Sequence, residues 1–297
     1  MTIDLAGVHI PTTTPFDAEG EVDREALRSN LAHLVGQGVQ GLVVGGSTGE
    51  AVLLDASERR ISWEIAREVG ADQLLIAGTG AESTRTTVRM CRAAAEAGAD
   101  AVLVQPPAFY KGAMTPPVLA DHYRAVADAS PVPVIVYQVP LRMSTLDFPT
   151  PLLAELSEHA NIVGMKDSRG DLDRLCEVVD ATAKGFQMLV GSGALLHAAL
   201  EAGAVGGILG IANLVPAWCV GIHAAHRSGD ESAAARLQSK VSPLHTGIVG
   251  GMGVPGVKFG LDRLGLVGGA PRPPLRALAE PGRTAVDALL TEAGLVG

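Results

Sequence analysis

The segment Asn161-Ile162-Val163-Gly164-Met165-Lys166-Asp167-Ser168 ends an apolar run in a lysine, and a polar loop follows at once. If the run is a buried strand, the Lys166 ammonium group at its end loses hydration, and desolvation lowers the pKa of a lysine. A neutral amine can attack a ketone and form a Schiff base. The competing interpretation is a solvated lysine just past the strand. The segment therefore predicts a buried strand and marks Lys166 as a candidate nucleophile.

Short apolar runs of this kind alternate along the chain with segments of helical periodicity. Strands are expected at residues 8–10, 41–44, 74–77, 101–104, 132–137, 162–166, 187–190 and 207–210. Helices are expected at residues 22–38, 57–69 (with Ser57 as N-cap), 86–97, 118–129, 150–157, 171–179 and 195–202, and throughout the remainder from residue 215.

This alternation of about eight units predicts a (β/α)8 TIM barrel with a C-terminal helical extension. Residues 1–214 would hold the barrel core through the last strand. Residues 215–297 would hold the last barrel helix and the C-terminal helices of the same structural unit. The alternative is an open doubly wound sheet, but no GxGxxG motif with a downstream acidic partner directly follows the first strand.

The composition argues against several classes of protein. The chain has 297 residues, 47% of them hydrophobic, with a net charge of −9 and no basic run, which argues against binding to nucleic acid or to an acidic membrane. Residues 1–10 lack a secretory signal pattern, and no apolar stretch is long enough to span a bilayer. The dispersed cysteines Cys91, Cys176 and Cys219 predict reduced core thiols in a cytoplasmic protein.

The predicted barrel brings polar residues together because its chemistry collects at the C-terminal ends of the strands. Tyr137 and Lys166 end neighbouring strands, so their side chains could meet inside the mouth. A phenol beside an amine nucleophile could carry protons on and off a carbinolamine. The alternative for Tyr137 is an aromatic cap whose hydroxyl group points into water.

A glycine-rich loop offers a candidate anion site. Gly45-Gly46-Ser47-Thr48-Gly49-Glu50 combines consecutive backbone N–H groups with two hydroxyls. It suits a carboxylate as well as a phosphate, since it lacks the Gly-Lys-Ser/Thr of a P-loop, and it could also be only a tight turn. Arg142 could bind a second carboxylate in bidentate fashion, or it could be a solvated loop residue. The eight histidines show no HxH or HExxH spacing, so no metal is predicted.

Three motifs resemble the pyruvate-utilising class I aldolase superfamily, which includes dihydrodipicolinate synthase and N-acetylneuraminate lyase. Gly46-Ser47-Thr48-Gly49-Glu50 resembles its GxxGE pyruvate loop, and Tyr137-Gln138-Val139-Pro140 resembles its Tyr-x-x-Pro turn. The segment from Ile162 to Ser168 resembles its Schiff-base signature. The motifs stand in the family's order, and the resemblance runs essentially from end to end.

The resemblance implies a site and a set of partners. Lys166 would form a Schiff base with pyruvate, with proton transfer by Tyr137 and Ser47 and no further cofactor. The substrates would be pyruvate and an aldehyde acceptor, or a 2-oxo acid, and the chain would assemble as a homotetramer, a dimer of dimers. The substrate-binding residues predicted on this basis are Gly46, Thr48, Tyr110, Arg142, Ser168 and Ile208.

The second substrate stays open. The segment 161–168, Val254-Pro255-Gly256-Val257-Lys258 and Tyr110-Lys111-Gly112 look most like 4-hydroxy-2-oxoglutarate aldolase. Arg142 instead resembles the arginine that binds a substrate carboxylate in dihydrodipicolinate synthases. The synthase also takes a tyrosine from a neighbouring subunit, and Tyr110 or Phe109 matches it, depending on where one gap is placed. A further alternative is a non-catalytic keto-acid-binding protein on the same barrel.

Overall fold

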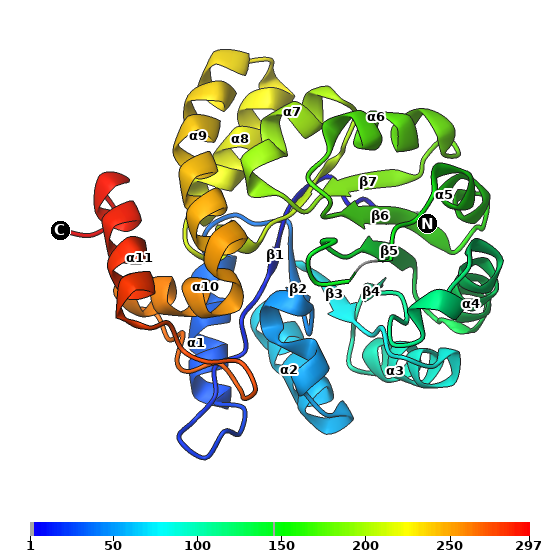
Figure 1. Cartoon of the computed structure of the whole chain (residues 1–297), viewed down its shortest axis with the longest axis horizontal. Coiled ribbons are helices and arrows are strands. Elements are labelled where there is room, and N and C mark those ends of the chain that lie inside the picture. The colour runs from blue at the N-terminus through cyan, green and yellow to red at the C-terminus, as the bar shows by residue number, and fades with distance from the viewer. Residues whose placement is uncertain (1–2, 145) are drawn as a thin grey trace.

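A closed barrel of eight parallel strands forms the centre of the molecule (Figure 1). The structure is a computed structural model that describes residues 3–144 and 146–297. The strands pair in chain order, and β8 closes the barrel against β1. They are β1 Gly7–Pro11, β2 Gly41–Val44, β3 Leu74–Gly78, β4 Ala101–Val104, β5 Val134–Gln138, β6 Ile162–Asp167, β7 Gln187–Val190 and β8 Gly206–Ile208. The predicted (β/α)8 barrel is confirmed.

Helices surround the barrel, and the last helix of the chain lies at the outer edge of the molecule (Figure 1). They are α1 Arg24–Val35, α2 Ala56–Val69, α3 Thr84–Glu96, α4 Pro116–Ala129, α5 Thr150–Ser157, α6 Leu172–Ala181, α7 Leu196–Glu201, α8 Pro216–Ser228, α9 Glu231–Leu244, α10 Gly251–Arg263 and α11 Glu280–Glu292. A π-helical segment, His245–Gly250, joins α9 to α10. The C-terminal helical extension is also confirmed, and the division proposed at residue 214 falls just before α8.

Two details of the sequence interpretation are wrong. The N-cap of α2 is Asp55 rather than Ser57, because the Asp55 carboxylate accepts hydrogen bonds from the N–H groups of Ser57 and Glu58 while the Glu58 side chain returns to the Asp55 N–H. All three cysteines are free, but only Cys91 and Cys219 are buried. Cys176 is exposed because α6 turns Leu175 and Val178, and not Cys176, toward the core.

The strands are apolar because both of their faces are covered. One set of side chains fills the barrel interior, and the larger core lies between the strands and the helices. The interior set includes Val43, Ile76, Leu103, Ile135, Leu189 and Ile208. Tyr137 joins this interior set from β5, so its ring belongs to the inside of the barrel.

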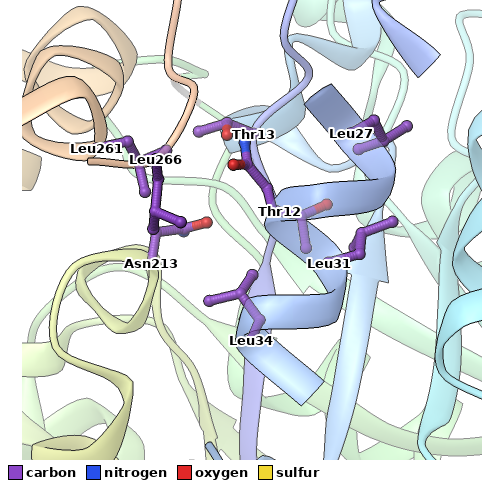
Figure 2. Close-up of a pocket in the computed structure, with 9 residues that line it drawn as sticks. Thr12, Thr13, Leu27, Leu31, Leu34, Asn213, Leu261 and Leu266 are labelled. Atoms are coloured by element: carbon purple, nitrogen blue, oxygen red, sulfur yellow. The ribbon is translucent and has the colours of Figure 1, made fainter. Parts of the chain in front are cut away.

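The C-terminal extension docks on α1. The Asn30 amide donates to the carbonyl of Val267 and accepts from the Val267 N–H, at 2.6 and 3.1 Å. A cavity of about 10 Å³, roughly the room of one water, lies beside this contact (Figure 2). Its lining comes from α1, the end of β1, the β8–α8 connection and the extension, and includes Thr12, Thr13, Leu27, Leu31, Leu34, Asn213, Leu261 and Leu266. The barrel and the extension thus share one core.

Among the described residues, none of the helices combines the length and apolar character needed to cross a membrane. The cytoplasmic location stays a prediction.

We predict that the free energy of unfolding falls as the pH drops from about 6.5 toward 4. Burial lowers the pKa values of His9, His122 and His245 to about 4. The unfolded chain takes up protons at these groups near pH 6.5, whereas the folded chain does so only near pH 4, so acid favours unfolding across that window. His9, which is fully buried, contributes up to about 3 kcal/mol to this loss. Urea unfolding between pH 7 and pH 4.5 measures the slope.

The controls are single substitutions. His9→Gln and His122→Gln should each flatten the slope, whereas His33→Gln, at an exposed position of α1, should leave it unchanged. A slope that neither of the first two variants changes would contradict the prediction.

Candidate active site

The pairing of β5 with β6 places Tyr137 directly opposite Lys166. Both side chains are buried, 3% and 6% exposed respectively. The Lys166 Nζ lies over the Tyr137 ring, 4.4 Å from its centroid. An ammonium ion is attracted to the face of a phenol ring, and an amine there is within reach of a proton carrier. The predicted meeting of these two side chains inside the barrel is confirmed.

The glycine-rich loop after β2 brings a second hydroxyl to Tyr137. The Ser47 Oγ lies 3.4 Å from the Tyr137 Oη. Gly45 opens the turn with a positive φ of 75°, which glycine adopts without strain. The N–H groups of Gly49 and Glu50 are used inside the turn. The Ser47 and Thr48 N–H groups have no acceptor among the described residues, so they remain free for an anion.

A buried ion pair between Glu50 and Lys258 fixes the end of this loop. Glu50 closes the loop with a positive φ of 58°. Its carboxylate lies 2.7 Å from the Nζ of Lys258, a fully buried lysine of α10. The same Nζ donates to the carbonyls of Thr14 and Ala270, at 2.9 and 3.0 Å. Burial lowers the pKa of Lys258, and the Glu50 carboxylate opposes that effect. Every N–H of the ammonium ion therefore has an acceptor.

A cavity of about 80 Å³ opens beside Lys166, and late parts of the chain form one of its walls. The wall is possible because Gly253 breaks the helix at φ 63° and ψ −146°, a conformation open essentially to glycine alone. The cavity is lined from the strands by Pro11, Tyr137 and Lys166, from the loops that follow strands by Ser47, Thr48, Pro140, Arg142, Met143 and Gly210, and from the late segment by Val249, Gly253, Val254 and Val257.

Arg142 lies at the exposed rim of this cavity, and its guanidinium donates to the carbonyl of Val249 at 3.2 Å. The loop that carries Arg142 is anchored by the buried Gln138 amide. This amide donates to the carbonyls of Val139 and Leu146 and accepts from the Phe148 N–H. A cationic group is thus held at the rim by a side chain at the end of β5.

His245 links the π-helical segment to the loop after β7. Its Nδ1 accepts from the Gly193 N–H at 3.2 Å, and its Nε2 lies 3.2 Å from the Ser192 hydroxyl. Burial, and then the charge of Arg142, lower the pKa of His245 to about 4. The imidazole is therefore neutral near pH 7 and positions the π-helical segment against the loop after β7.

Four of the predicted substrate-binding residues do not line the cavity. Gly46 borders a separate small cavity under its own loop. Ser168 packs against Gly191. Ile208 lies inside the barrel with Tyr137. The Tyr110 and Phe109 side chains are 73% and 80% exposed and stack edge to face at 5.1 Å. Their substrate-binding roles stay predictions.

Sequence reasoning missed the supporting residues Lys258 and His245. The signal that marked Lys166, a lysine flanked by apolar residues, also applies to Lys258 between Val257 and Phe259. His245 has no such signal, because its contact with the loop after β7 exists only in the folded chain.

Comparison with known proteins agrees with this geometry. The chain matches the model of the Dihydrodipicolinate synthetase family over residues 4–293. It is 40% identical over 243 residues to a probable mitochondrial 4-hydroxy-2-oxoglutarate aldolase of Emericella nidulans, covering 80% of this chain and 79% of that protein. It is 36% identical over 284 residues to a 4-hydroxy-tetrahydrodipicolinate synthase of Roseobacter denitrificans, covering 95% and 96%. Of the solved structures, the chloride-inhibited dihydrodipicolinate synthase of Acinetobacter baumannii complexed with pyruvate matches with a TM-score of 0.94, 31% identity and coverage of 99% and 100%.

A (β/α)8 barrel with a buried lysine and a phenol in its mouth defines the class of this protein as a class I aldolase or lyase. The match to the family model spans nearly the whole chain. The chain belongs to the dihydrodipicolinate synthetase family.

We predict that Lys258→Met costs about 3–5 kcal/mol in free energy of unfolding, because it leaves the Glu50 carboxylate buried without its cation. The double variant Lys258→Met/Glu50→Gln should lose less than the sum of the two single variants, by about 0.5–3 kcal/mol. Chemical unfolding of the four proteins gives this double-mutant cycle.

The exposed pair Arg28–Glu68, with atoms 2.9 Å apart, serves as the matched control. Arg28→Met should cost less than about 1 kcal/mol. Strict additivity of the Lys258 and Glu50 changes would show that the two charges do not stabilise each other.

Proposed function

We propose that this protein is a pyruvate-dependent aldolase that forms a Schiff base at Lys166 and cleaves or forms 4-hydroxy-2-oxoglutarate. The observation that supports this most directly is the Lys166 Nζ over the Tyr137 ring, in a cavity that also holds Ser47 and Arg142. The relative named for this aldolase is 40% identical over 80% of the chain, and the one named for the synthase is 36% identical over 95%. Identity favours the aldolase and coverage favours the synthase, so the choice between acceptors depends on the site itself.

The first half-reaction uses the barrel residues. The 2-oxo acid carboxylate would lie on the free N–H groups of Ser47 and Thr48. The Lys166 amine attacks the C2 ketone, and the carbinolamine loses water with proton transfer through Tyr137 and the Ser47 hydroxyl. The resulting iminium withdraws electrons from C3. Both cleavage and formation of the C3–C4 bond need this electron sink.

The second half-reaction breaks the C3–C4 bond. The 4-hydroxyl group gives up its proton toward Tyr137, the bond electrons move into the iminium, and glyoxylate leaves. The enamine then takes a proton at C3, and water hydrolyses the iminium to release pyruvate and the Lys166 amine. Arg142 at the rim would hold the carboxylate of the aldehyde, whether it departs after cleavage or is attacked by the enamine.

The runner-up function is condensation of pyruvate with aspartate semialdehyde. Arg142 favours it, because an arginine for the acceptor carboxylate resembles the dihydrodipicolinate synthases. A keto-acid-binding protein without turnover is the remaining alternative. We also propose a homotetramer in the cytoplasm, in which a second copy covers the exposed Phe109–Tyr110 pair.

We predict that borohydride added with pyruvate traps one pyruvate-derived adduct on Lys166. Reduction fixes the iminium as a stable secondary amine, so intact-mass measurement and peptide mapping detect it. Lys166→Ala should give no adduct and no turnover. An adduct on another lysine, or none in the wild-type protein, would overturn the proposed chemistry.

Tyr137→Phe is the matched variant for this experiment because it keeps the ring and removes the proton carrier. Borohydride should still trap the adduct, but more slowly because Tyr137 also assists iminium formation, and turnover should fall by about 10²- to 10⁴-fold. Trapping without turnover of any hydroxy-oxo acid or aldehyde by the wild-type protein would favour the binding-protein alternative.

We predict that Arg142→Gln raises the KM for 4-hydroxy-2-oxoglutarate by about 10- to 100-fold, because a hydrogen bond to a charged group contributes about 1.5–3 kcal/mol. Adduct formation with pyruvate alone should be unchanged. Assays of pyruvate release from 4-hydroxy-2-oxoglutarate and from sialic acid, and of pyruvate consumption with aspartate semialdehyde, identify the substrate.

Arg28→Gln, on α1 and paired with Glu68, is the control for lost positive charge and should leave all parameters unchanged. If only the aspartate-semialdehyde reaction proceeds, the protein is a synthase and the aldolase proposal fails.

A further inference from the structure

Three side chains with metal-binding atoms converge on the outer helical layer, apart from the cavity at Lys166. They are His197 of α7, His226 of α8 and Glu231 of α9, and their ligand atoms all lie within 4.8 Å of one another. The His197 Nε2 is 2.6 Å from one Glu231 carboxylate oxygen, and the His226 Nδ1 is 3.2 Å from the other. The two imidazole rings are 6.3 Å apart and steeply inclined, at 71°. None of the three lines the Lys166 cavity.

The fold itself sets this arrangement. Gly229 ends α8 with a positive φ of 78°, and Asp230 caps the start of α9, so His226 and Glu231 meet across a tight turn. His197 is brought to the same place because its backbone N–H donates to the Gln238 side chain of α9 at 2.9 Å. Gln238 also donates to the Gly193 carbonyl at 2.8 Å. The backbones of three helices are therefore positioned without help from an ion.

We propose that His197, His226 and Glu231 form a binding site for one divalent transition-metal ion of the zinc type. Two imidazole nitrogens and one carboxylate are a ligand set that Zn²⁺ accepts, whereas Mg²⁺ and Ca²⁺ prefer oxygen ligands alone. In a tetrahedral zinc site with bonds of about 2.05 Å, the ligand atoms lie about 3.3 Å apart. The separations in the cluster, from 2.6 Å to at most 4.8 Å, bracket this value.

The burial of the cluster fits such a site. The side chains of His197 and His226 are 14% and 26% exposed, and that of Glu231 is 48% exposed. The imidazoles can therefore hold the ion from the protein side, and the exposed side leaves the fourth position to water. An ion there would join α7, α8 and α9 and would stabilise the folded chain by mass action.

The test is a titration of the purified full-length protein, stripped with EDTA and dialysed, with ZnCl2 by calorimetry. A Cys176→Ser background removes the exposed thiol, which could bind zinc by itself. We expect one saturable Zn²⁺ per chain and a higher thermal unfolding midpoint with zinc. Each of His197→Gln, His226→Gln and Glu231→Gln should weaken binding by at least about 10-fold and reduce the zinc-dependent rise.

Glu231→Gln is the most informative variant because it keeps the size of an exposed side chain at the start of α9. His33→Gln, which removes an exposed histidine from α1, is the matched control and should bind zinc as the wild type does. MgCl2 should give no saturable signal. Absence of saturable zinc binding, or binding that Glu231→Gln leaves unchanged, would overturn the proposal.

Discussion

The buried ion pair between Glu50 and Lys258 joins the two halves of the candidate active site. Glu50 ends the loop that carries Ser47 and Thr48, and Lys258 belongs to the helix after the Gly253 break. A buried pair of charges is costly unless each charge is fully hydrogen-bonded. Here the Lys258 ammonium has three acceptors, and the second Glu50 oxygen accepts from the Arg272 N–H at 2.8 Å. The pair therefore fixes where the late segment lies relative to the barrel.

The register of β5 and β6 brings together Tyr137 and Lys166, the proposed reactive pair, and side-chain hydrogen bonds then place the groups around it. Tyr137 and Lys166 face each other because their strands pair at that position and both side chains turn to the interior. One residue later, Gln138 anchors the loop that carries Arg142 to the rim. A shift of one residue in this register would leave one of the two side chains inside the barrel and turn the other out of it.

The sequence predicted the barrel well because continuous apolar runs are typical of strands covered on both faces. It also marked Lys166, Tyr137 and Ser47 as candidates, since each follows or ends such a run, and the structure brings the three side chains together. Contacts between segments that are far apart in the sequence could not be predicted in this way. Glu50 and Lys258 are 208 residues apart, and His197 and Glu231 come from different helices. The spacings HxH and HExxH do not describe the cluster of His197, His226 and Glu231, because these residues come from three different helices.

The cavity beside Lys166 has one side from the strands and their loops and another side from the late residues Val249, Val254 and Val257. The groups proposed to capture the keto acid all come from the strands and their loops, while the opposite side is apolar and lies beyond the last strand. Exchange of side chains in the short stretch from Val249 to Val257 would therefore reshape the space proposed for the aldehyde. Lys166, Tyr137 and Ser47 would stay unchanged, so the same barrel can accommodate second substrates of different size.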